Sequence, residues 1–188
     1  LHAYANGLDR SPVSSACQEN APKSIGNGLT FPRSLSGREE ICSGIAMLSD
    51  RVAVRLRRAG MKAAGVSLAI RDPDFRDISR QRRLEPPTCL ARELSQAAVS
   101  LAEGCWNMDS PVRALTVTAL YLTSEDQAGV QLDLLGQADA PRRDRLERLD
   151  RTLDQIRAKY GRNAISPASS AGVCQGGVQE EDEEGATS

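Results

Sequence analysis

Hydrophobic residues recur with helical spacing in one long segment, residues 38–59. Its apolar positions step by 4, 3, 4 and 4 along the chain, which places one stripe on a helix of period 3.6. The stripe consists of Ile41, Ile45, Leu48, Val52 and Leu56. Ser36 is expected to cap this helix at its start, and Gly60 is expected to end it. The pattern therefore predicts a helix with one buried face.

Apolar and polar residues alternate in the next segment, residues 62–71, as is typical of a half-buried strand. Asp72-Pro73-Asp74 provides a turn, and residues 75–84 read as a second strand. Glu85-Pro86-Pro87 is expected to break that strand. The apolar face of the first strand carries Val66, Leu68 and Ile70. Together the two strands predict a hairpin.

Three further elements complete one domain. Residues 23–31 read as a strand with two glycines, residues 89–104 as a helix that Thr88 caps, and residues 111–122 as the strongest strand. One face of that last strand is expected to carry Leu115, Val117, Ala119 and Tyr121. The order β-α-β-β-α-β predicts an α+β fold of the ferredoxin-like kind: a four-stranded antiparallel sheet with two helices on one face. The other face would stay open to water or to a partner.

The segments around this domain differ from it in composition. Residues 1–15 begin with a short helical stretch that stops at Asn6-Gly7, which suggests a fragment of a longer protein, and residues 16–22 read as a linker. Residues 125–141 are predicted to form a loop. Residues 142–162 return to helix, with Leu146, Leu149, Leu153, Ile156 and Tyr160 at helical spacing. Residues 163–188 are rich in small and acidic residues and are predicted to be a disordered acidic tail.

Charge divides the chain although its formal net charge is only −1. Residues 23–124 carry 15 Lys/Arg against 10 Asp/Glu, whereas residues 125–188 carry 8 against 13. A basic domain is thus followed by an acidic end. Such a domain suits a polyanionic partner, although excess Lys and Arg also occur simply as solvated surface.

Little in the composition suggests catalysis, a metal or a membrane. The five cysteines form no C-x-x-C pair, His2 is the only histidine, and there is no G-x-S-x-G or P-loop, so no catalytic residue, metal ligand or cofactor is predicted. Asp72, Asp74 and Asp77 are more typical of a hydrated turn than of a cation site. No stretch approaches the ~20 apolar residues of a membrane span. Scattered cysteines suit a reducing compartment, so a cytoplasmic protein is expected. The protein is also expected to be a monomer.

Two of the predicted strands carry residues that suit phosphate binding. Arginine forks, small hydroxyls and glycines that expose backbone amides are the groups that bind phosphate oxygens. A solvated arginine-rich strand is an equally good interpretation of these residues. Because aromatic residues make up only 3% of the chain, base stacking is not expected, and contacts should go to the nucleic-acid backbone. The residues are Lys23, Ser24, Gly26, Asn27 and Thr30 in the first strand, and Ser79, Arg80, Gln81, Arg82 and Arg83 in the hairpin.

The predicted loop contains a short peptide with spaced apolar residues, Gln131-Leu132-Asp133-Leu134-Leu135. A glutamine followed by such residues can bind as an extended segment in an apolar pocket of a partner. The alternative is a turn that packs its leucines on its own domain.

Several of these segments, in this order, resemble one family. KSIGNGLTFPRSL, LSDRVAVRLRRAG, IRDPDFRDISRQRRL, PVRALTVTALYL and RLDRTLDQIRAKYGRNAI are similar to the C-terminal part of Y-family translesion DNA polymerases of the bacterial DNA polymerase IV type. YANGLDRSPV resembles the last piece of that family's thumb, which would be residues 1–15. The resemblance covers residues 1–165.

The resemblance implies that residues 23–124 are the little finger, which lays its sheet in the major groove of primer–template DNA. Phosphate contacts would come from Ser24, Ile25, Gly26 and Asn27, partly through backbone amides, and from Ser79, Arg80 and Arg82. Residues 131–135 resemble the family's sliding-clamp peptide, although Leu135 stands where Phe is usual.

The resemblance also implies that catalysis lies elsewhere. The family's palm, with the carboxylates that bind magnesium, lies upstream of the segments matched here, so this chain alone would not polymerise DNA. Its role would be to bind damaged DNA and the clamp. The alternatives are a ferredoxin-like RNA-binding module, a small-molecule regulatory domain and a clamp-binding adaptor without a polymerase role.

Overall fold

The computed structural model describes residues 2–8, 22–125, 140–161, 164 and 165. The predicted α+β architecture is confirmed, with a C-terminal helix after the β-α-β-β-α-β domain. The elements of the domain are β1 (Ser24–Leu35), α2 (Arg38–Arg58), β2 (Met61–Arg71), β3 (Asp77–Thr88), α3 (Ala91–Cys105) and β4 (Val112–Ser124). The flanking helices are α1 (His2–Ala5) and α4 (Ala140–Tyr160).

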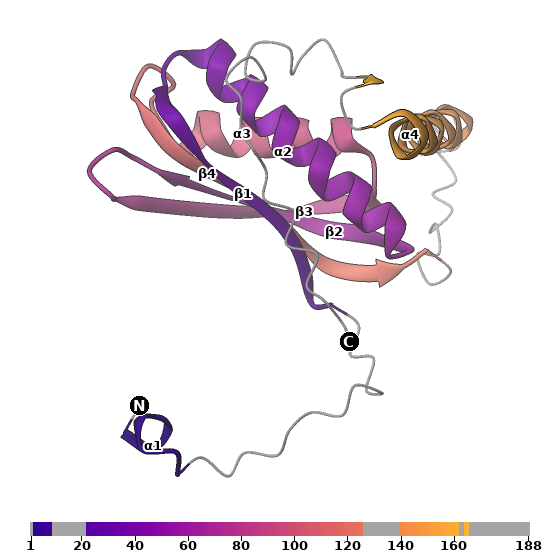
Figure 1. Ribbon diagram of the computed structural model, residues 1–188. Helices are drawn as coiled ribbons and strands as arrows, with labels where there is room; N and C mark the ends of the chain where they lie inside the picture. Colours follow the sequence, from indigo (N-terminus) through magenta and orange to yellow (C-terminus); the bar gives the residue numbers. More distant parts are fainter. Residues whose placement is uncertain (1, 9–21, 126–139, 162–163, 166–188) are drawn as a thin grey trace.

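The strands lie in the order β1-β4-β2-β3, and every neighbouring pair is antiparallel. β4 and β2 are therefore central, and β1 and β3 are the two edges. Helices α2 and α3 cover one face of the sheet, and none of the described helices covers the other face (Figure 1). We call this uncovered side the open face.

The core lies between α2, α3 and the covered face of the sheet. All five residues of the predicted α2 stripe are 0% exposed. Val66, Leu68 and Ile70 from β2 are also buried there, as the alternation predicted. Truncating one such fully buried leucine typically costs about 2–5 kcal/mol, because a cavity remains. This core fixes which face of the sheet is left for binding.

Both edge strands run further than predicted. β1 continues past Pro32 to Leu35, with a register irregularity between Thr30 and Leu35. β3 continues through Glu85-Pro86-Pro87 to Thr88, so the prediction that this tripeptide ends the strand is wrong. The physical reason is position in the sheet, since an edge strand tolerates proline where no partner needs its N–H.

The predicted helix caps are wrong in detail. The N-cap of α2 is Gly37 rather than Ser36, and its first turn is bonded differently: the Glu40 carboxylate accepts the backbone N–H of Ser36 at 3.0 Å. The N-cap of α3 is Leu90, while Thr88 Oγ1 accepts the N–H of Leu90 at 3.0 Å. Gly60 follows α2 at a φ of 62°, as expected of a helix stop.

Tyr121 is not on the buried face of β4. Leu115, Val117 and Ala119 are buried as predicted, but Tyr121 is 47% exposed and Leu122 packs against the core instead. The reason is the backbone of Tyr121, whose φ of 52° shifts the alternation of the strand by one residue. The ring therefore lies on the open face.

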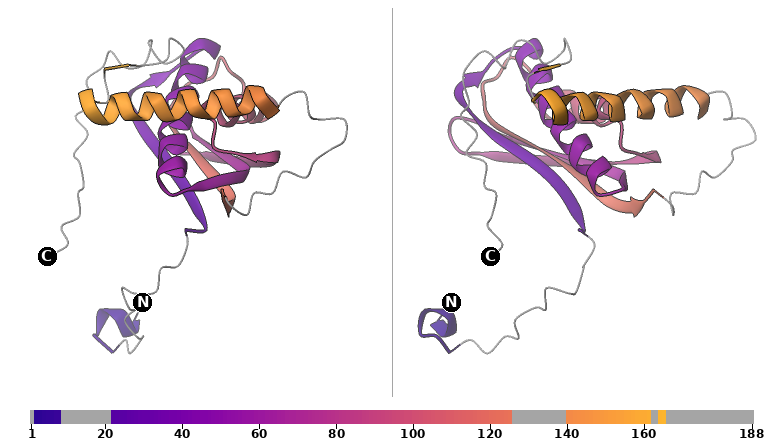
Figure 2. Two further views of the ribbon diagram at one scale, coloured as in Figure 1. Left: turned by 90° about the vertical axis from the view of Figure 1, so that its right-hand side faces the viewer. Right: turned by 45° about the vertical axis from the view of Figure 1, so that its right-hand side comes forward.

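Helix α4 lies on the helix side of the sheet, across the C-terminal part of α2 (Figure 2). It is held by ion pairs to α2, β2 and α3. Arg57 of α2 is central: its guanidinium donates to both carboxylate oxygens of Asp154 at 2.7 and 2.9 Å and to Asp150 at 3.0 Å. The ion pairs run in both directions: acids of α4 pair with Arg57 and Lys62 of the domain. Arg143 and Arg157 of α4 pair with Glu93 and Asp50.

Several predicted segments lie outside the described residues. These are most of the thumb end and linker (9–21), the loop with the clamp peptide (126–139) and the acidic tail (166–188). The division of the chain at these segments stays a prediction. The predicted short N-terminal helix is present as α1, and Gly7 follows it at a φ of 67°.

Candidate nucleic-acid interface

The strand registers arrange the side chains of the open face in four rows that run across the sheet. The first row begins at Ser24 and the last at Thr30, both of β1. From β1 to β3 the rows are Ser24, Leu120, Gly65 and Arg83; Gly26, Thr118, Ser67 and Gln81; Gly28, Thr116, Ala69 and Ser79; and Thr30, Ala114, Arg71 and Asp77. Small and hydroxyl-bearing residues predominate, so most of this face is small and polar.

Packing against the neighbouring strand explains why β1 has glycines at these positions. A Cβ built on Gly26 would lie 2.8 Å from Thr118 Oγ1, and one on Gly28 would lie 2.5 Å from Thr116 Oγ1. The threonines of β4 therefore occupy the space that side chains at these positions would need. Two hydroxyls stand over β1 as a result.

Asp77 is the single carboxylate in these four rows, and it is paired. Arg71 donates to its two oxygens at 2.7 and 2.8 Å, and this hydrogen bond lowers the pKa of Asp77. The pair stands at the hairpin end of the sheet. No other carboxylate stands in the four rows to repel a polyanion.

The β1 edge presents its predicted residues in different ways. Lys23 and Ser24 are exposed, whereas the Ile25 side chain is 6% exposed and belongs to the core, so only its backbone is left for a ligand. Asn27 is paired with Val117, which places its side chain on the covered face. Thr30 is exposed on the open face.

Arg55 adds a cation to this edge that the sequence did not single out. From α2 it donates through Nη1 to the carbonyl oxygen of Gly26 at 2.6 Å. Its position in the last turn of α2 was visible in the sequence, but its contact with a strand 29 residues earlier was not.

The β3 edge separates its arginines between two faces. Arg80 and Arg82 do share one face, as the alternation predicted, but they pair with Leu68 and Val66 and so lie on the helix side at the sheet's edge. Arg82 points to Ser100 of α3, with Nη1 3.4 Å from its Oγ. Arg80 and Arg82 therefore do not lie on the open face. Ser79 and Gln81 do face that surface.

Arg83 is the arginine of β3 that reaches the open face. It pairs with Gly65, and its guanidinium lies 4.6 Å from the centre of the Tyr121 ring. The sequence prediction included Arg83 among the basic residues of β3 but put Tyr121 on the same face of its strand as Leu115, Val117 and Ala119. The stacked pair depends on the unusual φ of Tyr121, which no pattern of residue types reveals.

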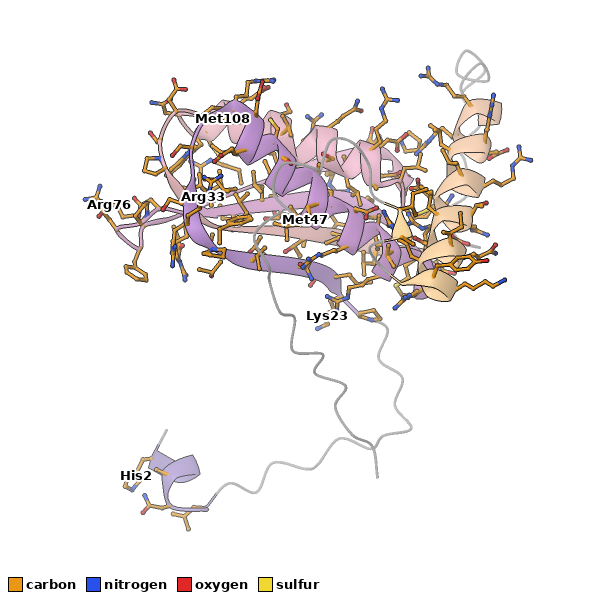
Figure 3. All side chains as sticks on the ribbon, turned by 45° about the horizontal axis from the view of Figure 1, so that its top comes forward. His2, Lys23, Arg33, Met47, Arg76 and Met108 are labelled. Carbon is orange, nitrogen blue, oxygen red and sulfur yellow. The ribbon has the colours of Figure 1, made fainter. Side chains whose placement is uncertain are left out.

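Basic side chains also mark both ends of the sheet. Lys23 stands where β1 begins, and Arg76 stands at the tip of the β2–β3 hairpin, at the opposite end (Figure 3). The tip is ordered by Asp72, whose side chain accepts the N–H of Arg76 at 2.8 Å. This confirms the predicted turn.

Metal binding and thiol chemistry are the alternatives to compare with this interface. No group of three or more His, Cys, Asp or Glu that could hold a metal ion occurs among them. Burial raises the pKa of the Cys89 thiol to about 11, so it is not a thiolate at neutral pH. None of the described helices combines the length and the apolar character that a bilayer span requires.

Comparison with known proteins identifies the domain. The impB/mucB/samB family C-terminal domain matches residues 22–134, which includes the whole β-α-β-β-α-β unit. The chain therefore belongs to this family and carries its C-terminal domain, the little finger of Y-family DNA polymerases. The resemblance drawn from the sequence is confirmed.

Curated relatives extend the match beyond that domain. The chain is 37% identical over 161 residues to "DNA polymerase IV" of Acetivibrio thermocellus, which covers 86% of this chain and 40% of that protein. It is 36% identical over 170 residues to "DNA polymerase IV" of Pelotomaculum thermopropionicum, covering 90% and 40%. With "DNA polymerase IV" of Moorella thermoacetica it shares 36% over 180 residues, covering 94% and 43%. The chain thus spans about two fifths of the length of these relatives.

Proposed function

We propose that this domain binds the sugar–phosphate backbone of duplex primer–template DNA through its open face and the two sheet edges. The observation that supports this most directly is the chemistry of that face. Hydroxyls, glycines and other small residues predominate on it, with cations at both edges and one carboxylate already paired. Such groups bind phosphate oxygens and carry little sequence information.

The dimensions of the sheet fit a double helix. Three inter-strand spacings separate β1 from β3, which amounts to about 14 Å. The major groove is about 12 Å wide. A sheet laid along the groove therefore brings Lys23, Ser24 and Arg55 toward one phosphate strand, and the arginines of β3 toward the other.

The residues predicted for binding divide between the two edges. On β1 they act through the Lys23 and Ser24 side chains and Thr30, and through the backbone of Ile25, Gly26 and Asn27. On β3, Ser79 and Gln81 contact the groove side while Arg80 and Arg82 contact phosphates from beyond the edge. Because Arg80 and Arg82 project from the helix side, their contacts go to the outer surface of a backbone.

The parent activity we propose is error-prone translesion synthesis, because the domain is the little finger of Y-family polymerases and the relatives are DNA polymerases. The catalytic carboxylates and their magnesium would belong to the parts of those relatives that this chain does not match. The role of this chain is to hold damaged primer–template DNA during lesion bypass.

We also propose that residues 131–135 bind a sliding clamp. The support is the sequence of the peptide, Gln131-Leu132-Asp133-Leu134-Leu135, and its place between the domain and α4. Binding to a clamp would raise the local concentration of the domain at a primer end.

The DNA proposal is tested by replacing Arg80 and Arg82 with Ala together. Fluorescence anisotropy with a duplex primer–template, measured at several salt concentrations between about 50 and 200 mM, should show weaker binding and a log–log salt slope smaller by about 1.8. The matched control replaces Arg58 and Arg92, exposed arginines of α2 and α3, with Ala. Equal losses in both double variants would mean that only net charge matters and would refute the assigned contacts.

The clamp proposal has its own test. Replacing Gln131 and Leu134 with Ala should abolish retention of the chain on an immobilised sliding clamp while its affinity for duplex DNA stays the same. Undiminished retention on the clamp would refute this role and leave the DNA proposal standing.

A further inference from the structure

Tyr121 and Arg83 form a stacked pair on the open face, at the end of the sheet where β1 begins. The guanidinium carbon of Arg83 lies 4.6 Å from the centre of the Tyr121 ring. Both side chains are exposed. No ion pair joins Arg83 to a described carboxylate, and the contact that the structure gives its guanidinium is the one with the Tyr121 ring.

The backbone around this pair is built to admit the ring. Tyr121 has a φ of 52°, in the left-handed region that residues with a Cβ rarely adopt. Beneath the ring is Gly65, where an added Cβ would stand 2.7 Å from Tyr121 Cδ2. Gly65 is also the register partner of Arg83. A glycine in β2, a strained residue in β4 and an arginine in β3 therefore meet at one point.

A regular β4 would have buried this side chain, and the strain keeps it on the surface instead. With Leu122 taking the place in the core, the fold does not need the ring for packing. Strain of this kind persists where the surroundings over-determine it, and such residues are found preferentially at functional sites.

Stacking leaves the hydrogen-bonding edge of a guanidinium free. Because the guanidinium of Arg83 is planar, contact of one face with the ring leaves its N–H edge available and limits its rotamers, so less freedom is lost when it binds an anion. Ser24 stands at the other end of the same row, three strands away.

We propose that Tyr121 holds Arg83 as a preorganised fork for one phosphate of duplex DNA, with Ser24 and Lys23 facing the opposite strand. This inference rests on the proposed function and adds a contact to it. Tyr121 acts as a positioning residue, since its effect on the phosphate passes through Arg83. The low aromatic content argued against base stacking. In this proposal Tyr121 acts on the open face without stacking on a base.

The test compares four variants by anisotropy with the same primer–template and with a single strand of equal length. Arg83→Gln should weaken duplex binding and lower the salt slope by about 0.9, the value for one phosphate. Tyr121→Asn removes the ring but suits a positive φ. It should weaken binding about two- to five-fold with the slope unchanged, because the charge remains. Tyr121→Phe, which restores the ring, should restore the affinity. The double variant Arg83→Gln/Tyr121→Asn should bind like Arg83→Gln alone.

A second measurement uses the wild-type chain and does not depend on the stability of any variant. The Arg83 Nε–H resonance should carry a ring-current shift from Tyr121 and should change when duplex DNA is added. Thermal unfolding of each variant, with Arg92→Gln as the single-charge control, separates lost binding from lost fold.

The outcomes separate failure of the Arg83–Tyr121 fork from failure of the proposed DNA binding. Additive losses in the double variant, or a loss in Tyr121→Asn without one in Arg83→Gln, would mean that the ring contacts a base directly and would overturn the fork. Loss of binding in the Arg80/Arg82 variant with none in Arg83→Gln would overturn the fork alone. If the wild-type chain fails to bind duplex DNA, both proposals fall.

Discussion

Replacing Arg57 with Met is expected to release helix α4 from the domain while the sheet and the other helices stay folded. The Arg57 side chain is 5% exposed, and its partners Asp150 and Asp154 are 19% and 20% exposed. It also donates to the carbonyl oxygen of Cys89 at 3.0 Å. Burial by itself disfavours the cation, yet the hydrogen bond to Asp154 and the nearby carboxylates raise the pKa of Arg57.

The size of the free-energy loss depends on the carboxylates that Arg57→Met leaves without a partner. Removing one partner of a buried ion pair typically costs about 3–5 kcal/mol, because the other charge stays desolvated. Here two carboxylates would be left, but α4 can leave the domain and return them to water. The loss should therefore be confined to the docking of α4. At about 3 kcal/mol, the amides of α4 would exchange about a hundred-fold faster.

Hydrogen exchange followed by mass spectrometry measures this directly. Peptides from α4 should lose protection in Arg57→Met, whereas peptides from α2 and β4 should keep it. Arg58→Met, an exposed neighbour in the same helix turn, is the matched control and should leave α4 protected. Unchanged protection of α4 in Arg57→Met, or equal loss in the control, would refute the reasoning.

The direction of the pH dependence gives a further check on the same variant. Burial raises the pKa of Asp150, and the charge of Arg57 opposes that rise. A raised pKa means that the docked state binds the proton better than the free helix does, so docking gains as pH falls and loses as pH rises. Without the charge of Arg57, the pKa of Asp150 in the docked state should rise further. The docking of α4 should then depend more strongly on pH.

Two other predictions concern stability. The bonds to Arg33 and to the Ser36 N–H lower the pKa of Glu40 from 4.5 to about 2, so its contribution should be complete above 4.5 and should disappear as pH falls toward 2. Urea unfolding of Glu40→Gln should show a loss of less than about 1 kcal/mol at neutral pH, because the pair is exposed, and almost no difference from wild type at the acid limit. Gly28→Ala should lower stability by about 1–3 kcal/mol, because the new methyl group meets Thr116. Gly104→Ala, in an open position of α3, should instead be neutral or stabilising in the same thermal unfolding assay.

The short-range spacing of hydrophobic residues was sufficient to predict most of the helices and strands. The spacing from Ile41 to Leu56 predicted α2 and its buried face, since a helix of period 3.6 places those residues on one side whatever it packs against. The alternation of Val66, Leu68 and Ile70 did the same for β2. Predictions failed where a local rule depended on the neighbour: prolines 86 and 87 stay within β3 because that strand lies at an edge.

The sequence named candidate residues for the interface, but it predicted only part of their arrangement. Sequence alternation put Arg80 and Arg82 on one face, but it cannot say which face the helices cover. That was decided by the pairing of these two residues with Leu68 and Val66. Arg55 joined the site through a contact with a distant strand, and Tyr121 joined it through a single backbone angle.

The sequence by itself determined the order of the elements, their buried stripes and the family, because these depend on residue types at short spacing. The tertiary structure alone decided which arginine reaches the open face and how the acids of α4 meet the bases of α2. The reason is that the face a residue occupies, and the charge it meets, are set by pairing between segments that the chain brings together only when it folds.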